Sequence, residues 1–371
     1  MANKRNKSTG ILEWFTTGLG QVIISLVVPV VTFLVMWRVF IFLRDGDAPK
    51  LVTAVVAVIW GVGGVATLYF ISNWLIEHLP PVWVQRLQPF VFIGPAIAIL
   101  AWYLAIPTVR TFYISLFNAN STQFVGLKNY IAIFTERSMW EAFRNNLMWM
   151  VFGASSSVIF GLLIAVLADR SRFESIAKSL IFLPMAISFV GAGVIWNFIY
   201  EVRPAGTPQI GLLNALVQAF GGKPIAWTAW TEIRPWNNLF LIVIMIWLQT
   251  GYAMVLFSAA LKGIPEELLE AARVDGASEV QIFFRIMIPY IMGTIVTVST
   301  TIVIFTLKIF DIVLVMTGGQ YGTEVIATQF YRQYFSNRNF GFGSAIAVIL
   351  LVAVIPVMIY NLRQFSEREA F

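Results

Sequence analysis

Residues 266–289 read EELLEAARVDGASEVQIFFRIMIP and form the most polar long run between two strongly apolar segments of the chain. Pro265, at the first helical position and followed by two glutamates, favours a helix start, because the helix dipole stabilises negative charge in the first turn. Gly276 stands where a C-cap would end that helix, and Ser278 with Gln281 has the spacing of a capping box that begins a second one. The run therefore predicts a helix, a sharp turn and a second short helix on a membrane surface, with an apolar face suited to a groove on another protein.

The same run carries a motif. Residues 270–272 are EAA, Gly276 follows after three residues, and residues 286–289 (IMIP) follow after nine more. This pattern resembles the EAA loop of ABC importer permeases, EAA-x3-G-x9-I-x-L-P, with Ile288 in place of the usual leucine. In that family the loop inserts into a cleft of the ATPase subunit and passes nucleotide-driven motion to the membrane. The alternative is an ordinary amphipathic loop helix. The resemblance implies a coupling role for five positions: Glu270, Ala271, Ala272, Gly276 and Pro289.

The composition is that of an integral membrane protein. The chain is 58% hydrophobic and 12% charged, whereas soluble proteins average about 25% charged. It has no cysteine, which excludes disulfides, a thiolate nucleophile and a zinc–cysteine site. The net charge is +6, but the basic residues cluster at the ends of apolar segments, where they report orientation, so we expect no nucleic-acid partner. The sequence has no G-x-x-x-x-G-K-[ST] motif and therefore no P-loop for ATP.

Membrane-spanning helices need about 20 apolar residues. The candidates are residues 19–43, 51–71, 90–115, 146–168, 179–200, 239–261, 287–310 and 344–362. We therefore predict an all-α polytopic membrane protein with about eight transmembrane helices. By resemblance, the last six form an ABC type I importer permease core.

Charge predicts the orientation of these spans. With eight spans, both termini lie on one side of the membrane. The basic residues on that side are Lys4, Arg5, Lys7, Arg170, Arg172, Lys178, Lys262, Arg273, Arg285, Arg363 and Arg368. The positive-inside rule makes this side the cytoplasm; the opposite loops also hold basic residues, but they are longer and count for less. We expect a multi-pass protein of a bacterial-type inner (plasma) membrane with both termini cytoplasmic.

A proline-containing segment divides the chain. Pro80, Pro81 and Pro89 separate two N-terminal spans from the rest. Residues 1–89 are predicted to hold a cytoplasmic tail, two transmembrane helices and a linker. Residues 90–371 are predicted to hold the six-helix core, with the EAA loop at residues 262–289. The resemblance covers this second part, and the first two spans match the family only in number.

The outer loops add further signals. In the loop at residues 117–145, an amphipathic interfacial helix is expected, with Tyr130 and Trp140 as anchors; its FVGLKNY segment resembles one that recurs in sugar-importer permeases. A short helix is expected at residues 212–220. Residues 317–319 (TGG) match a TxGGP-type turn of the same family, with glutamine in place of proline.

Polar residues within the spans indicate where a substrate could bind. A sugar site needs hydrogen-bonding groups and an aromatic face in an apolar wall. Gln249 and Tyr252 are three residues apart and share one helix face, and Phe305 offers an aromatic face from the next span. Four threonines of that span add hydroxyls, for which bonding to their own helix carbonyls is the favoured interpretation: Thr297, Thr300, Thr301 and Thr306.

Lys308 has two open interpretations. An ionisable residue in a membrane span is a functional-site hypothesis by default. Lys308 is, however, near the outer end of its span, where it can extend to the interface or pair with Asp311.

The six-span core resembles the maltose-type permease that holds sugar within its own spans. Aligned on local sequence landmarks, the resemblance places sugar-contacting positions at Met185, Phe189, Leu248, Gln249, Tyr252, Phe305 and Lys308. Of these only the tyrosine is chemically retained, so a different sugar is expected. A closer likeness is to permeases for α-glucosides and glucosyl-type compatible solutes. The implied partners are a second homologous permease, two ATP-binding subunits, a soluble solute-binding protein and the sugar; ATP and Mg are used by the ATPase subunits, and no cofactor is expected in this chain.

Two other classes of function are alternatives. A self-sufficient secondary carrier needs a coupling-ion site, usually carboxylates at the membrane midplane, and often shows an inverted repeat; neither is apparent. A membrane enzyme acting on a lipid-linked sugar needs a catalytic acid or base, and Glu201, Glu232 and Glu324 lie in outer loops without a visible partner. The sequence therefore predicts a non-enzymatic transport subunit of an ATP-driven sugar importer.

Overall fold

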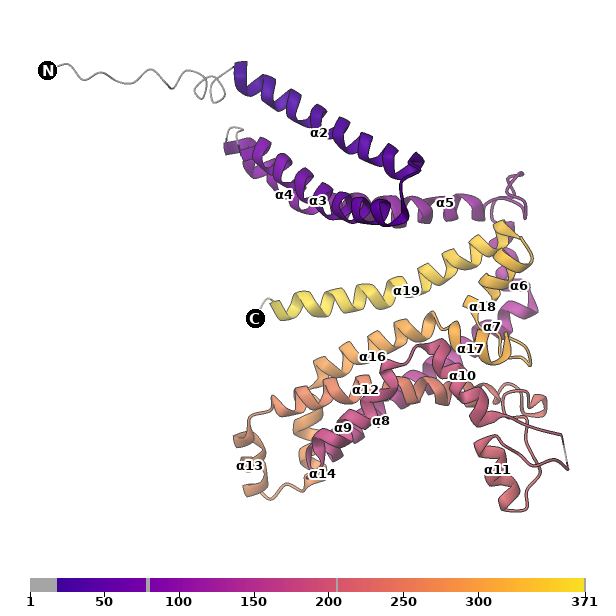
Figure 1. The fold of residues 1–371 in the computed structure, drawn as a ribbon. Helices are drawn as coiled ribbons and strands as arrows, with labels where there is room; N and C mark the ends of the chain where they lie inside the picture. Colours follow the sequence, from indigo (N-terminus) through magenta and orange to yellow (C-terminus); the bar gives the residue numbers. More distant parts are fainter. Residues whose placement is uncertain (1–18, 78–80, 205, 370–371) are drawn as a thin grey trace. The chain divides into compact units, whose positions relative to one another are not determined.

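The computed structural model describes residues 19–77, 81–204 and 206–369, and the regular elements in these residues are all helices (Figure 1). One isolated antiparallel bridge joins Phe117 to Phe124. The chain divides into two compact units, Met1–Thr108 and Val109–Phe371, which are described separately.

The first unit is built from long apolar helices. They are α2 (Leu19–Asp45), α3 (Lys50–Glu77), α4 (Pro81–Leu100), η1 (Ala101–Ala105) and the first residues of α5 (Ile106–Ser115). Helices α2 and α3 approach closely at Gly64, where a Cβ atom would lie 2.7 Å from the Met36 Cε. Nearby, Trp60 Nε1 donates a hydrogen bond to the Met36 carbonyl (3.3 Å). A small residue and one interhelical hydrogen bond are the usual means of packing helices in lipid.

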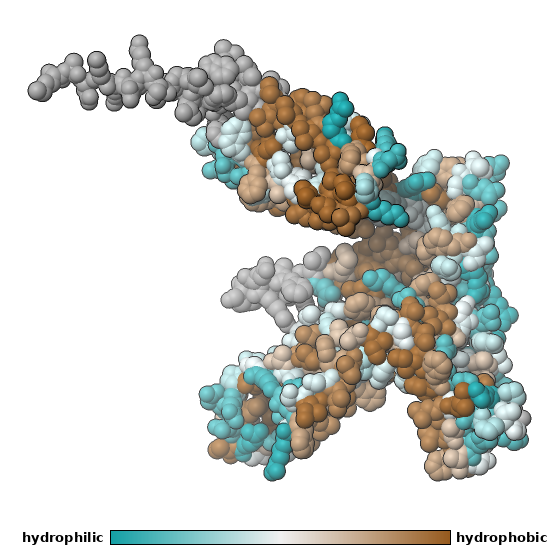
Figure 2. All heavy atoms as spheres, viewed as in Figure 1, coloured by the Kyte–Doolittle hydropathy of each residue, from teal (hydrophilic) through white to brown (hydrophobic). Residues whose placement is uncertain are grey.

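The second unit has two polar ends and an apolar middle. It consists, after α5, of α6 (Lys128–Thr135), α7 (Arg137–Met148), η2 (Trp149–Ala154), α8 (Ser155–Asp169), α9 (Glu174–Phe182), η3 (Leu183–Ala186), α10 (Phe189–Tyr200), α11 (Leu212–Ala219), η4 (Thr231–Ile233), α12 (Asn238–Lys262), α13 (Glu266–Val274), α14 (Glu279–Ile282), η5 (Phe283–Met287), α15 (Ile288–Tyr290), α16 (Met292–Leu307), α17 (Asp311–Thr317), α18 (Ile326–Tyr331), η6 (Arg332–Ser336) and α19 (Phe340–Glu369). Helices α13 and α14 lie at one end of this unit, called here the EAA-loop end, and α6, α7 and α11 lie at the other, the far end (Figure 1). Figure 2 shows hydrophilic residues gathered at both ends and hydrophobic residues between them, as a membrane-spanning unit requires.

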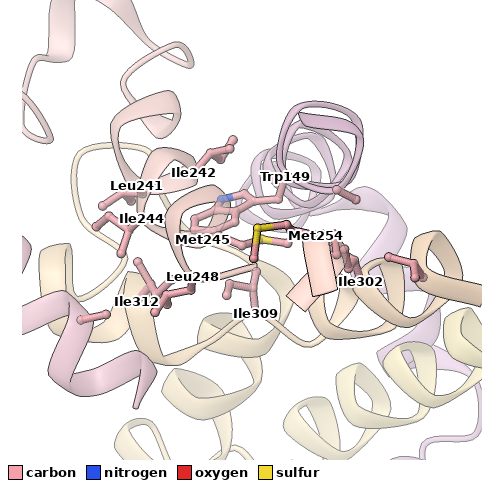
Figure 3. Packing of buried hydrophobic residues seen from close by; sticks show 14 of the residues in the cluster. Trp149, Leu241, Ile242, Ile244, Met245, Leu248, Met254, Ile302, Ile309 and Ile312 are labelled. Carbon is pink, nitrogen blue, oxygen red and sulfur yellow. The ribbon is translucent and has the colours of Figure 1, made fainter. Parts of the chain in front are cut away.

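Helix α12 is the centre of this unit. It packs along α8, α9 and α16, and its buried side chains join a cluster that includes Trp149, Met245, Met254 and Ile302 (Figure 3). Glycine allows one of these helix pairs to come very close: a Cβ atom on Gly161 of α8 would lie 2.4 Å from the Cβ atom of an alanine on α12. Close backbone approach at small residues is typical of membrane helix packing.

Seven of the eight predicted spans have counterparts. Five helical runs are long and apolar enough to cross a membrane: Lys50–Glu77, Pro81–Ser115, Arg137–Asp169, Asn238–Lys262 and Phe340–Asn361. Two bent helix pairs raise the number to seven. The predicted first span, residues 19–43, coincides with α2, but the side chains of residues 19–26 lie outside the described part. The all-α membrane fold is therefore confirmed, and the count of eight stays a prediction.

Two spans that the sequence shows as continuous are bent. Glu174–Ala186 meets Phe189–Tyr200 at 102°, and Glu279–Tyr290 meets Met292–Leu307 at 70°. In the first pair, Ser188 is extended and its hydroxyl accepts a hydrogen bond from the Gly191 N–H (3.0 Å), so a new helix begins there. In the second, Pro289 precedes the bend and has no N–H to continue the helix ladder. Hydropathy averages over such breaks and does not detect them.

The predicted domain boundary and the division of the structure differ in position. The sequence places a boundary after residue 89, whereas the compact units divide after Thr108. Both positions fall within one helical run, Pro81–Ser115. The functional division at residue 89 stays a prediction.

Candidate functional site

A cavity of about 270 Å³ lies between three segments of the second unit. It is lined by Met185, Ile187, Phe189, Leu248, Gln249, Tyr252, Thr301 and Phe305. The first three come from the bend between α9 and α10, the next three from α12 and the last two from α16. The walls are apolar except for one amide and two hydroxyl groups, which is the composition expected of a small-molecule site.

The polar groups of this cavity differ in their hydrogen bonding. The Thr301 hydroxyl donates to the Thr297 carbonyl of its own helix (2.8 Å). Within the described residues, neither the Gln249 amide nor the Tyr252 hydroxyl makes a hydrogen bond, although Gln249 is only 7% exposed. Neither group is among the fully buried unpaired polar atoms of the described residues. The cavity therefore presents two hydrogen-bonding groups that a ligand can satisfy.

The fold explains how these residues meet. Gln249 and Tyr252 follow one face of α12, whereas Met185 and Phe189 are brought to it by the bend before α10. Gly251 sets the spacing, because a Cβ atom there would lie 2.5 Å from the Ile181 carbonyl oxygen of α9. Helix α9 can thus lie against the backbone of α12 at the level of the cavity.

The structure brings together six of the seven predicted substrate positions. These are Met185, Phe189, Leu248, Gln249, Tyr252 and Phe305. Lys308 is not in the wall: it caps the C-terminal end of α16, is exposed and, in the described part, forms no ion pair with Asp311. Ile187 was missed, because its place in the wall depends on the bend. The role of these residues in binding stays a prediction.

The hydroxyl groups of all four threonines of α16 form hydrogen bonds with carbonyl groups of their own helix, which is the interpretation that the sequence favours. Each hydroxyl donates to the carbonyl four residues earlier: Thr297, Thr300, Thr301 and Thr306. Thr300 also donates to the Asn361 Oδ1 of α19 (2.6 Å). Of the four, only Thr301 lines the cavity.

The EAA loop folds as two short helices around a glycine turn. Gly276 has φ +80°, a left-handed conformation that favours glycine. The predicted capping box is present, since Ser278 N–H donates to the Gln281 Oε1 (2.8 Å) and Gln281 N–H donates to the Ser278 hydroxyl (3.3 Å). One detail is corrected: Pro265 is extended (ψ 130°) and serves as the N-cap, so the helix begins one residue later at Glu266.

The surface of this loop is open. Glu270, Ala271 and Pro289 are exposed and Ala272 is half-buried. Val274 is 87% exposed, and a cavity of about 430 Å³ lies beside Gly276. Exposed apolar side chains next to a hollow, on a charged loop, form a surface suited to docking with another protein.

Ion pairs fix the position of the loop. Glu279, the first residue of α14, accepts hydrogen bonds from Arg170 at the end of α8 (2.7 Å) and from Arg273 of α13 (2.9 Å). The hydrogen bond to Glu279 raises the pKa of the Arg273 guanidinium. Both loop helices are thus tied to the helix bundle through one carboxylate.

The predicted turn after α17 is present at the far end. Gly318 has φ +60° and caps α17, and Gly319 has φ +78°. A Cβ atom on Gly319 would meet the Glu324 carboxylate at 3.2 Å, so glycine makes room for the ion pair between Glu324 and Arg332 (2.7 Å). Burial raises the pKa of Glu324 to about 7 despite the opposing effect of Arg332.

Two buried asparagines, which no sequence pattern singles out, hold this far-end loop. Asn145 Nδ2 donates to the Gly322 and Glu324 carbonyls, each at 2.8 Å. Asn146 Oδ1 accepts from the Ile326 N–H (2.8 Å). The partners are separated by nearly half the chain, and local sequence patterns do not predict contacts between residues so far apart in the sequence.

The FVGLKNY segment also has a structural role. Asn129 donates to the Ser115 carbonyl (2.8 Å) and the Phe117 carbonyl (2.7 Å). Tyr130 shares a hydrogen bond with the Ser115 hydroxyl (2.6 Å). One helix is predicted in this loop and the structure has two, α6 and α7; the predicted helix at residues 212–220 is found as α11. Trp140 is exposed, as an interfacial anchor requires.

The family described as binding-protein-dependent transport system inner membrane component matches residues 157–368, from α8 into α19. The chain belongs to this family. It is therefore a multi-pass membrane permease of an ABC importer, a transport component rather than an enzyme, and the secondary-carrier and lipid-linked-sugar alternatives are set aside.

Relatives and a solved structure agree with this assignment. The permease is 56% identical over 278 residues to the osmoprotective compounds uptake permease protein GgtC of Synechocystis sp., covering 75% of this chain and 99% of that one. It is 45% identical over 335 residues to the alpha-glucoside transport system permease protein AglF of Rhizobium meliloti, covering 86% and 98%. A chain of a bacterial alginate ABC transporter has the same fold, with a TM-score of 0.65 at 20% identity over 75% of this chain and 94% of that one.

Proposed function

We propose that this permease imports an α-glucoside or a glucosyl-type compatible solute in an ATP-driven complex. The observation that carries the proposal is the pair of unsatisfied groups, the Gln249 amide and the Tyr252 hydroxyl, in an otherwise apolar cavity. Sugar hydroxyls can donate to and accept from both groups, and the rings of Tyr252 and Phe305 can cover the apolar face of a pyranose. The names of GgtC and AglF, which refer to osmoprotective compounds and α-glucosides, support this substrate class.

The proposed complex contains a second homologous permease, two ATP-binding subunits and a soluble solute-binding protein. A second permease would complete the cavity on its open side. In this arrangement Lys308, exposed one helical turn beyond Phe305, lies at the rim between the two permeases and donates to a sugar hydroxyl. ATP and Mg are used by the ATP-binding subunits, and no cofactor is assigned to this chain.

In the proposal, energy reaches the cavity through the EAA loop. Glu270, Ala271, Ala272, Gly276 and Pro289 form or support the surface that enters a cleft of the ATPase subunit. The exposure of Val274 supports this role, since an apolar side chain of that kind is stabilised when a partner covers it. The loop then lies in the cytoplasm, and both chain termini lie on the same side.

The test is ATP hydrolysis by the complete complex in proteoliposomes with its binding protein. Matched α- and β-glucosides, disaccharides and glucosyl-type compatible solutes are compared with free monosaccharides. We expect one α-glucosyl compound to stimulate ATP hydrolysis and to be taken up with it, and its β-anomer to do neither. Uptake without ATP, or stimulation only by a ligand without a sugar ring, would contradict the proposal.

A further inference from the structure

Three helices of the second unit are joined by one lysine at the EAA-loop end. Lys178 of α9 contacts the Asp169 carboxylate at the end of α8 and the Ser258 hydroxyl of α12. Ser258 in turn donates to the Asp169 Oδ1 (2.7 Å). The side chains of Lys178 and Asp169 are only 18% and 17% exposed. This triangle of Asp169, Lys178 and Ser258 is called the tri-helix junction below.

A further carboxylate extends the tri-helix junction to the start of the EAA loop. Glu174 Oε1 accepts from Lys178 (2.5 Å) and also contacts the Nζ atom of Lys262. Lys262 is the last residue of α12 and directly precedes the EAA-loop helices. One lysine–glutamate–lysine bridge thus connects the tri-helix junction to the entry of the loop.

The exit of the loop is connected as well. Arg170, the neighbour of Asp169 in the chain, binds the Glu279 carboxylate at the start of α14 (2.7 Å). Two consecutive residues therefore contact different parts of the unit. Asp169 contacts α9 and α12 of the helix bundle, and Arg170 contacts α14 of the EAA loop. The Arg170–Glu279 ion pair is thus a contact through which a displacement of α14 would reach residues 169–170 and the tri-helix junction.

Both helices lead to walls of the cavity: α12 lines it directly, and α9 continues through η3 to Met185. Ser258 follows Tyr252 by six residues on α12, a rise of about 9 Å. Lys178, in the middle of α9, precedes Met185 of η3 by seven residues. Beyond that point the chain bends by 102°, so α9 and α10 are separate rods that meet at the cavity. Shifting α9 against α12 changes the distance between Met185 and Tyr252.

We propose that Asp169, Lys178 and Ser258 act as a relay that passes movement of the EAA loop to two walls of the sugar cavity, one on α12 and one reached from α9 through η3. The inference rests on the proposed function, since it presumes coupling through that loop. The three residues are positioning residues and do not touch the sugar. Because Lys178 and Asp169 are largely removed from water, their attraction is screened less than that of a surface pair. In the proposal, this attraction keeps the ends of α8 and α9 in contact when the EAA loop moves.

The test uses graded variants in the complete reconstituted complex. Ser258→Ala removes one hydroxyl, Lys178→Met removes the charge at similar length, and Lys178→Arg keeps the charge. Arg172→Met is the matched control: it removes a cation from the same α8–α9 loop, where Arg172 is exposed and forms no ion pair in the described part. Basal ATP hydrolysis, its stimulation by binding protein and sugar, and sugar imported per ATP are measured together with complex yield.

Loss of one hydrogen bond predicts a fall of about two- to tenfold in sugar stimulation for Ser258→Ala. Sugar stimulation should be lower still in Lys178→Met. It should be mostly retained in Lys178→Arg and equal to the wild type in Arg172→Met. Basal hydrolysis should persist, with less sugar imported per ATP. A merely structural role would lower complex yield and melting temperature but leave sugar per ATP unchanged in the complexes that assemble.

Wild-type stimulation and wild-type sugar per ATP in both Ser258→Ala and Lys178→Met would overturn the relay. If Lys178→Met does not assemble, Ser258→Ala decides, because it removes a single oxygen atom. Failure of the wild-type complex to respond to any sugar would instead contradict the proposed function. The two failures are therefore distinguishable in one set of measurements.

Discussion

Single residues of α12 divide between the core and the cavity. Met245 and Met254 lie in the core next to Trp149 (Figure 3), whereas Gln249 and Tyr252 reach the cavity. The difference matters because core residues act through packing, and the two cavity residues keep hydrogen-bonding capacity that the protein itself does not use. Their substitution should therefore affect sugar before it affects folding.

Gln249→Leu keeps the volume of the side chain and removes its hydrogen bonds. We expect sugar affinity of the reconstituted complex to fall by about five- to two-hundredfold, since a desolvated hydrogen bond is worth about 1–3 kcal/mol. Thr301→Val is the matched control in the same cavity: its hydroxyl is already bonded to the Thr297 carbonyl, so affinity should change little. Parallel loss of complex yield in Gln249→Leu would place this residue in the permease interface instead.

Glu324 is the residue from which we expect a pH effect. Burial raises its pKa from 4.5 to about 7, so the folded state favours the protonated form. The corresponding contribution to stability is present below about pH 4.5 and is lost as the pH rises through about 7. Glu324→Gln stays neutral and should remove this part of the pH dependence.

The measurement is the difference in melting temperature between wild type and Glu324→Gln across that pH range in detergent. The melting temperature of Glu324→Gln should rise relative to that of the wild type as the pH rises. Hydrogen exchange in the loop after α17 should show the same trend, because Asn145 ties that loop to α7. Parallel pH profiles for the two proteins would refute the prediction.

At the scale of elements, the turn of the EAA loop depends on backbone conformation and not on space. No atom lies within 4 Å of a Cβ built on Gly276, yet its φ is +80°. Gly276→Val should destabilise the turn by about 1–2 kcal/mol, because β-branched residues are strained there. Gly276→Asn should be milder, since asparagine tolerates the left-handed region. Gly276→Val should therefore lose more of the co-purifying ATPase subunit than Gly276→Asn. Equal retention of the ATPase subunit by both variants would show that the turn is not needed for docking.

The contact between α9 and α12 depends on space. A Cβ atom on Gly251 would lie 2.5 Å from a backbone oxygen of α9, so Gly251→Ala must push the helices apart next to the cavity. We expect a cost of about 1–3 kcal/mol, together with weaker sugar binding. Gly63→Ala on α3 is the control, because nothing lies within 4 Å of its Cβ position. A melting temperature equally unaffected in both variants would contradict this account.

These elements also show what sequence can and cannot predict. The EAA loop was predictable because caps, turn glycine and motif spacing are all local. Six cavity residues were predictable because they keep fixed offsets from recognisable landmarks. Lys308 joins them in the prediction through its offset and its charge within an apolar span, whereas the structure ends α16 just before it and leaves it outside the cavity wall. The place of Ile187 in the cavity wall depends on a 102° bend. The tri-helix junction depends on hydrogen bonds between residues 80 and 89 positions apart in the chain. No local sequence pattern specifies either feature.

At the scale of the whole molecule, two relatives match different shares of the chain. GgtC is matched over 99% of its length by 75% of this chain, so a quarter of the chain has no counterpart in that permease. AglF is matched by 86% of this chain. The cavity, the EAA loop and the tri-helix junction all lie in the second unit, where the proposed function resides.

The last prediction concerns orientation. Helix α19 runs from the far end to the EAA-loop end (Figure 1), and an EAA loop that binds an ATPase must face the cytoplasm. Arg170, which follows α8, and Lys262, the last residue of α12, lie at that same end, in agreement with the positive-inside rule. A reporter fused after Phe371 should therefore be active only in its cytoplasmic form.

The matched fusion places the same reporters in the far-end loop that precedes α11, near Thr207, where the opposite pattern is expected. Using two sites in one unit separates orientation from poor expression, because an inverted protein exchanges the two signals, whereas an unstable one loses both. Since the proposed direction of transport depends on which end meets ATP, a periplasmic signal at Phe371 with a cytoplasmic signal near Thr207 would refute both the orientation and the proposal of import.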